Sequence, residues 1–175
     1  MVYQNDDGMP DTAQHYACAF MCILRARESL HGIPVTVASA GDAWNGAIKA
    51  GVISGDINGD GVMGDDPREL CIQDYGRLFD FLHINLMEVP IESPGLPCDK
   101  DDNGILRILP THEPIDTRAY WVMERWKWKI SHFILGDGTG THIIYDPIRG
   151  GSLTRANGTV QDLRVFRIYE GGKYE

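Results

Sequence analysis

Apolar side chains recur at intervals of three and four along residues 15–30, the spacing that gathers them on one face of a helix. Arg25 and Glu28 fall on the opposite side, which we expect to face water. Gly32 and Pro34 end this helix, because glycine readily adopts the left-handed conformation that follows a helix and proline cannot continue the helix. The apolar face consists of Ala17, Phe20, Met21, Leu24 and Ala26.

A second helical pattern covers residues 35–52, and a third starts at Pro67 and runs to about Leu82. Proline is favoured at the first position of a helix, since its missing N–H needs no partner there. The stretch between the two patterns is rich in Asp, Asn and Gly. We therefore expect a helix–loop–helix over about residues 36–82.

The chain after residue 84 has the alternation and the β-branched and aromatic content of strands. Residues 99–104, rich in Asp, Asn and Gly, are expected to form a turn, with a second cation site as the alternative. Helices followed by strands predict an α+β fold, with N-terminal helices packed on a C-terminal antiparallel sheet in a single domain over residues 1–175. Strands are expected at residues 84–91, 119–126, 129–135, 141–145 and 163–169.

The polar stretch between the second and third helical patterns follows the beginning of a calcium-binding loop. Asp56, Asn58 and Asp60 supply side-chain oxygens at loop positions 1, 3 and 5. Gly61 permits the sharp turn at position 6, and Val62 offers its backbone carbonyl at position 7. Oxygen ligands of this kind suit Ca²⁺, which we expect the loop to bind.

Position 12 of the loop, where an acidic side chain normally closes the site, is Pro67. Asp66 lies one residue earlier and Glu69 two residues later. We expect Asp66 to be the remaining ligand, with Glu69 as the alternative. The competing interpretation is a turn rich in Asp, Asn and Gly that binds no cation.

Composition and charge narrow the classes of partner. The 175 residues are 43% hydrophobic, enough for a substantial core, and their formal net charge of −9 argues against nucleic acid as the main partner. No apolar run approaches the roughly 18 residues of a membrane span. No secretion signal opens the chain, so we expect synthesis in the cytoplasm.

The cysteines indicate a free thiol rather than a zinc site or a disulfide framework. None of them forms a Cys-x-x-Cys pair, and the histidines show no zinc-binding spacing. Two cysteines one helical turn apart are poorly arranged for a disulfide. We expect reduced thiols, of which at least one is available for chemistry. The cysteines are Cys18, Cys22, Cys71 and Cys98.

A thiol-dependent hydrolase needs a nucleophilic Cys, a His that takes its proton and a group that orients the His. Cys18 opens the first apolar helix, where the partial positive charge of the helix N-terminus favours the thiolate. His132 begins one predicted strand and Asp146 ends the next. If these strands pair antiparallel across the turn at residues 136–140, His132 and Asp146 come within one or two residues of lying directly opposite each other.

Each of these residues also has a simpler interpretation. A Cys in an apolar helix is usually a small core residue, and this applies to Cys18 and more strongly to Cys22. His132 beside an apolar run is compatible with a buried histidine of the core. His15 and His142 are alternative bases.

Three parts of the chain carry a family resemblance: Gln4-Asn5-Asp6 ahead of Pro10, Cys18 at the head of its helix, and Ser131-His132-Phe133-Ile134-Leu135 followed by Tyr145-Asp146-Pro147. Together they resemble papain-like cysteine peptidases of the bacteriocin-processing (double-glycine) peptidase-like group, including its stand-alone phage and bacterial relatives. The resemblance implies a papain-like fold in which Cys18 attacks, His132 is the base and Asp146 orients it. It implies that Gln4 donates a hydrogen bond to the oxyanion, a role for which Gln14 is a rival.

This resemblance implies a cysteine peptidase or amidase. A small acidic chain with a calcium loop is similar to phage or bacterial lysis enzymes (endolysins), so we expect peptidoglycan peptides as substrate, Ca²⁺ as cofactor and action on the cell wall after release. The incomplete loop suggests that the enzyme stays incompletely ordered until it meets calcium outside the cytosol. The alternatives are a peptidase that processes a protein or peptide, and a calcium-stabilised binding module in which Cys18 is only a core residue.

Overall fold

The fold is α+β, as the sequence predicts, with the helices preceding the strands. The computed structural model describes residues 1–89, 98–100, 106–108, 120–127, 131–137, 143–149, 159–169 and 171. The chain forms two compact units, of which the first comprises Met1–Ile84 and Pro147–Arg149 and the second comprises Asn85–Asp146 and Gly150–Lys173. The expected single domain over residues 1–175 stays a prediction.

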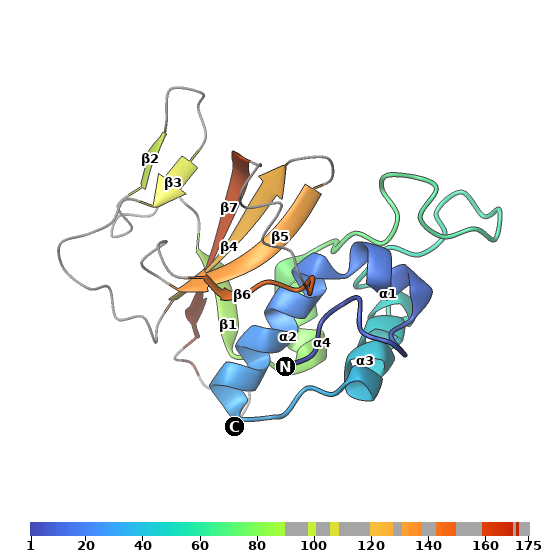
Figure 1. Cartoon of the computed structure of the whole chain (residues 1–175), viewed down its shortest axis with the longest axis horizontal. Helices are drawn as coiled ribbons and strands as arrows, with labels where there is room; N and C mark the ends of the chain where they lie inside the picture. The colour runs from blue at the N-terminus through green and yellow to red at the C-terminus, as the bar shows by residue number, and fades with distance from the viewer. Residues whose placement is uncertain are drawn as a thin grey trace. The chain divides into compact units, whose positions relative to one another are not determined.

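The first unit contains the helices drawn in blue to green in Figure 1: α1 (Asp11–Tyr16), α2 (Cys18–His31), α3 (Val37–Lys49) and α4 (Tyr75–Leu82). The helix expected over residues 15–30 is α2, and Gly32 ends it with φ 63°, as predicted. The N–H of Gly32 donates to the carbonyl of Glu28 at 3.0 Å, which satisfies one carbonyl of the last turn. None of the helices in the described ranges is long and apolar enough to span a membrane.

An aromatic pair joins α2 to α3 in the core of the first unit. Phe20 and Trp44 meet edge to face with ring centroids 5.4 Å apart, and each is only 1% exposed. The indole N–H of Trp44 donates to the hydroxyl of Thr12 at 3.0 Å, so its polar group is satisfied although the ring is buried. Burial of a Phe side chain stabilises the fold by roughly 1.5–3 kcal/mol. These contacts fix α2, whose first residue is Cys18, among the helices of this unit.

The prediction that the second helix of the helix–loop–helix begins at Pro67 is wrong. Pro67 lies in a turn, and α4 begins only after Asp74, whose side chain accepts a hydrogen bond from the N–H of Arg77 at 2.8 Å. Leu70 interrupts a helix because its φ is 54°, in the left-handed region that an L-residue adopts only at a cost. The N–H of Leu70 instead donates to the carbonyl of Ser54 at 3.0 Å, which joins this segment to the residues just before the loop.

The described residues of the second unit form two antiparallel sheets. The larger has the strand order β1-β7-β4-β5-β6, and the smaller pairs β2 with β3. The strands expected from the sequence are present, although β7 begins four residues earlier than predicted. The turn expected at residues 99–104 is wrong at Asp99 and Lys100, which belong to β2, and its other residues lie outside the described residues. The strands are β1 (Leu86–Val89), β2 (Cys98–Lys100), β3 (Leu106–Ile108), β4 (Tyr120–Lys127), β5 (Ser131–Asp137), β6 (Ile143–Tyr145) and β7 (Thr159–Ile168).

Candidate active site and cation loop

His132 and Asp146 form a hydrogen-bonded pair in the second unit. The Nε2 atom of His132 lies 2.7 Å from Oδ1 of Asp146. The side chain of His132 is 1% exposed and that of Asp146 is 12% exposed. A buried imidazole needs a polar partner, and a carboxylate on one ring nitrogen fixes both the ring orientation and the tautomer. The pair therefore has the geometry of a base held by its orienting group.

The pairing of β5 with β6 explains this contact. Leu135 pairs with Tyr145 in an antiparallel register. Continued by one residue, this register brings Asp146 opposite Ile134, which shares a face of the strand with His132 because side chains alternate. Diagonal neighbours on one face of an antiparallel pair lie within reach of each other's side chains. The predicted strand pairing and the predicted proximity of His132 and Asp146 are both confirmed.

Cys18 is the first residue of α2, as the sequence predicts. Its side chain is a free thiol, and the residue is 9% exposed. Ala17 precedes it as the N-cap, and no side-chain hydrogen bond caps the helix within this fully described segment. The partial positive charge of the helix N-terminus therefore falls at Cys18. Cys22, one turn further along, is fully buried, which fits a core residue.

The members of the expected triad belong to different units, Cys18 to the first and His132 with Asp146 to the second. A contact between the thiol and the imidazole is therefore a proposal, made below. Of the alternative bases, His15 is an exposed residue of α1 that meets the ring of Tyr16 edge-on with centroids 6.2 Å apart. His142 lies outside the described residues.

Gln4 is 2% exposed and is held at both its backbone and its side chain. Its backbone N–H donates to the carbonyl of Pro147 at 2.8 Å, and its Nε2 donates to the carbonyl of Gln14 at 2.8 Å. The side chain of Gln14 donates in turn to the carbonyl of Met9 at 3.0 Å. A side-chain amide has two N–H donors, so each Gln keeps one beyond these bonds. Gln4 is the more buried of the two rivals for the oxyanion role.

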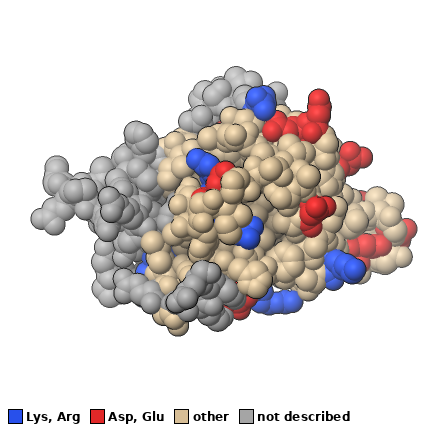
Figure 2. Space-filling model, turned by 90° about the horizontal axis from the view of Figure 1, so that it is seen from below, with Lys and Arg blue, Asp and Glu red and all other residues tan. Residues whose placement is uncertain are grey.

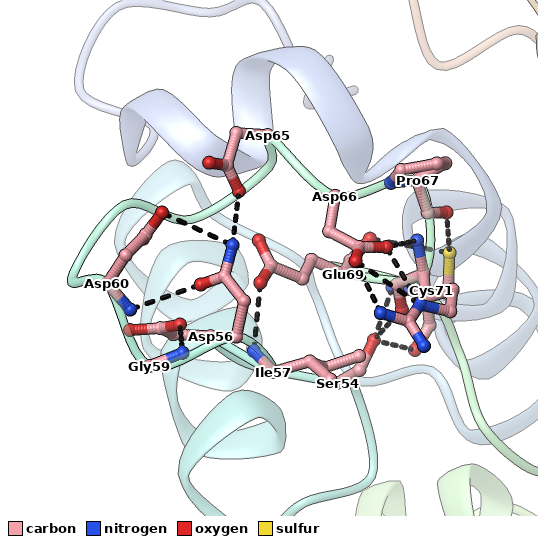
Figure 3. A network of polar contacts seen from close by, with 12 residues as sticks. Ser54, Asp56, Ile57, Gly59, Asp60, Asp65, Asp66, Pro67, Glu69 and Cys71 are labelled. Atoms are coloured by element: carbon pink, nitrogen blue, oxygen red, sulfur yellow. Dashed lines mark hydrogen bonds and ion pairs between the residues drawn. The ribbon is translucent and has the colours of Figure 1, made fainter.

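The loop that follows α3 is shaped by side chains that accept hydrogen bonds from its own backbone (Figure 3). Asp56 accepts from the N–H of Gly59 at 2.6 Å and from the N–H of Gly61 at 2.8 Å. Asn58 accepts from the N–H of Asp60 at 3.1 Å. Such bonds are the usual reason why Asp and Asn occupy tight turns. Asp60 accepts from the N–H of Val62 at 2.7 Å, so all three expected side-chain ligands help to fold the loop.

Glu69, and not Asp66, faces this loop. The carboxylate of Glu69 accepts from the N–H of Ile57 and from the N–H of Gly64, each at 2.8 Å, and the residue is only 2% exposed. Asp66 turns to Arg68, whose guanidinium lies 2.6 Å from its Oδ2, and this hydrogen bond lowers the pKa of Asp66 to about 2. Glu69 thus contacts the backbone of the loop that carries Asp56, Asn58 and Asp60 (Figure 3), whereas the carboxylate of Asp66 is engaged by Arg68.

Negative charge accumulates at the loop. Asn58 donates from Nδ2 to Asp60 at 3.2 Å and to Asp65 at 3.3 Å, so one amide bridges two carboxylates. Partial desolvation, then Asp60 and more weakly Glu69, raise the pKa of Asp65, because a like charge opposes its ionisation. Figure 2 shows acidic side chains gathered at the right-hand edge, on the side where Figure 1 draws this loop.

The described residues contain no group of three or more His, Cys, Asp or Glu side chains arranged to hold a metal ion. The oxygen donors of the loop suit Ca²⁺ by their chemistry, and their mutual repulsion would be relieved by a cation. Their carboxylates, however, are engaged with backbone N–H groups of the loop and do not form a cage.

Comparison of the chain with protein families, with characterised proteins and with solved structures finds no match.

Proposed function

We propose that this chain is a cysteine peptidase or amidase with a papain-like arrangement, in which Cys18 is the nucleophile and His132 the base. Asp146 orients the base, and Gln4 stabilises the oxyanion. The observation that carries the proposal is the 2.7 Å bond between Nε2 of His132 and Oδ1 of Asp146. The position of Cys18 at the start of α2 supports it.

The bond to Asp146 selects which nitrogen of His132 reacts. With Nε2–H donating to the carboxylate, the neutral ring carries its lone pair on Nδ1. Nδ1 is then the atom that takes the proton of the thiol. The carboxylate also stabilises the imidazolium that results, in a site where His132 is 1% exposed.

In the proposed reaction the thiolate of Cys18 attacks the carbonyl carbon of an amide. The second N–H of the Gln4 amide and the backbone N–H of Cys18 stabilise the oxyanion, where loss of one donor costs about 10²–10³ in rate. The imidazolium of His132 then protonates the leaving nitrogen, and the C–N bond breaks to give an acyl-thioester and a free amine. His132 next removes a proton from water, which attacks the thioester, releases the carboxylic acid and restores the thiolate.

The substrate class that we propose is the peptide of peptidoglycan, with the enzyme acting as a phage or bacterial lysis enzyme. This part rests on the family resemblance and on the acidic calcium-type loop. Ca²⁺ held at Asp56, Asn58, Asp60, the Val62 carbonyl and Glu69 would neutralise the loop and order it. Glu69 replaces Asp66 in this set because Asp66 is paired with Arg68.

Digestion of purified cell walls tests the proposal. The chain is incubated with peptidoglycan, with calcium and with a strong chelator, and the released fragments are identified by mass. We expect new amine and carboxyl ends within the peptides, and no release by Cys18→Ala at unchanged thermal stability. Cleavage of an unstructured protein but not of cell walls would favour the processing peptidase. Absence of cleavage in both would favour the binding module.

A further inference from the structure

The segment that follows Asp146 is hydrogen-bonded to the N-terminal segment of the chain through Pro147 and Arg149. The carbonyl of Pro147 accepts from the N–H of Gln4 at 2.8 Å. Two residues later, the backbone N–H of Arg149 donates to the side chain of Asn5 at 3.0 Å. All of these residues belong to the first unit, so the chain passes from the second unit to the first at the peptide bond between Asp146 and Pro147.

The side chain of Arg149 makes two further contacts with the N-terminal segment. Its guanidinium donates to Oδ1 of Asp6 at 2.7 Å and lies over the ring of Tyr3, 4.5 Å from the centroid. The other oxygen of Asp6 accepts from the backbone N–H of Tyr3 at 3.0 Å. The hydrogen bond from Arg149, followed by that from Tyr3, lowers the pKa of Asp6, so the carboxylate keeps its charge. Tyr3, Asn5, Asp6 and Arg149 are called the Arg149 clamp below.

An exposed ion pair alone would contribute little to the stability of this segment. The side chain of Arg149 is 66% exposed, and such pairs contribute about 0–1 kcal/mol to stability. The Arg149 clamp differs from a single ion pair because its contacts are made by Tyr3 and Asn5, which flank Gln4 in the sequence, and by Asp6. It therefore holds the proposed oxyanion residue beside Pro147, the residue joined covalently to Asp146.

We propose that Arg149 is a positioning residue for the hydrolytic site, which acts by fixing Pro147, the residue joined covalently to Asp146, to the segment that carries Gln4. This inference rests on the proposed function. Arg is suited to the task, since its planar guanidinium can stack on Tyr3 while it donates to Asp6, which a lysine ammonium cannot do in the same geometry.

The test is the pH dependence of Cys18 alkylation by iodoacetamide in the full chain, followed by mass spectrometry of the peptide that contains Cys18. For Arg149→Gln we expect the midpoint of this profile to rise by about one pH unit, which slows alkylation at pH 6 about tenfold. Arg149→Lys should recover only part of the rate. The matched control is Arg164→Gln, which breaks an exposed pair with Glu88 at the same 2.7 Å distance and should leave the profile unchanged.

Superimposable profiles for Arg149→Gln and the wild type, or an equal shift in Arg164→Gln, would overturn the inference while leaving the proposed function intact. If wild-type Cys18 reacts no faster than Cys71 at pH 6, the proposed function fails and the inference fails with it. If Arg149→Gln does not fold, Asp6→Asn answers the same question, because it removes the partner charge and leaves an acceptor for the N–H of Tyr3. An unshifted profile in folded Asp6→Asn then counts against the inference.

Discussion

The hydroxyl of Tyr16 donates a hydrogen bond to the backbone carbonyl of Gly64, 2.9 Å away. Tyr16 is the last residue of α1, two positions before Cys18, and Gly64 belongs to the loop that follows α3 and begins at Asp56. The N–H of Gly64 donates at the same time to Glu69 at 2.8 Å. Gly64 is therefore held between the buried carboxylate of the loop and the segment that leads to Cys18.

Removal of the Tyr16 hydroxyl should loosen this link. Tyr16→Phe loses one hydrogen bond and keeps the ring, so the free energy of unfolding should fall by about 0.5–1.5 kcal/mol in urea denaturation. Tyr169→Phe is the control, because Tyr169 has the same 43% exposure and lies outside the loop. Equal effects of the two substitutions would argue against a link through Gly64.

Gly64→Ala should destabilise the chain more than Gly32→Ala. Both glycines have positive φ, 94° and 63°, where an L-residue costs about 1–2 kcal/mol. A Cβ at Gly64 would also lie 2.8 Å from the Tyr16 ring, whereas one at Gly32 would have nothing within 4 Å. In a Tyr16→Ala background the excess cost of Gly64→Ala should disappear, since the clashing ring is gone. Strictly additive unfolding energies for this pair would contradict the steric account.

Calcium should stabilise the chain through Glu69 and not through Asp66. At about a hundredfold excess over its dissociation constant, a ligand adds about 2.7 kcal/mol to the free energy of unfolding. We expect Glu69→Gln and Asp60→Asn to reduce the calcium-induced rise in Tm, and Asp66→Asn to retain it. A rise in Tm that is lost in Asp66→Asn but kept in Glu69→Gln would reverse the assignment. Identical Tm values with calcium and chelator in the wild type would remove calcium from the account.

The contribution of the Arg149 clamp to stability should depend on pH, because Asp6 is titratable. Its folded-state pKa lies below the unfolded value of about 3.9, so its contribution is present above that pH and is lost as the pH falls through the folded pKa. The Tm of Asp6→Asn should therefore lie below that of the wild type at pH 7, and the two should converge in strong acid. Asp7→Asn, at the exposed neighbouring residue, should show no such convergence. A difference that is constant from pH 2 to pH 7 would contradict the role of the ion pair.

Local patterns in the sequence predict much of this architecture. The apolar spacing predicts a helix over residues 15–30 that ends before Gly32, and α2 runs from Cys18 to His31, because helix formation depends largely on residues within a few positions. The proximity of His132 to Asp146 is predictable because β5 and β6 are neighbours along the chain and pair antiparallel.

Features that depend on distant partners were not predictable. Pro67 has the local preference for a helix start, but pairing of the following segment with Ser54 overrides it. Asp66 lies nearer than Glu69 to position 12 of the loop, and only the ion pair of Asp66 with Arg68 and the burial of Glu69 reverse this preference. The Arg149 clamp joins residues more than a hundred positions apart and has no local pattern in the sequence.

The central claim is that the thiol of Cys18 is activated by the imidazole of His132. The most direct measurement is the rate at which iodoacetamide alkylates Cys18 at pH 6, relative to Cys71, in the wild type and in His132→Gln. Cys71 is the internal reference, because it is an exposed free cysteine and partial desolvation of its sulfur raises the pKa of the thiol. We predict that Cys18 reacts much faster than Cys71 in the wild type and loses this advantage in a folded His132→Gln chain. A Cys18 rate that matches Cys71, or that His132→Gln leaves unchanged, would contradict the account.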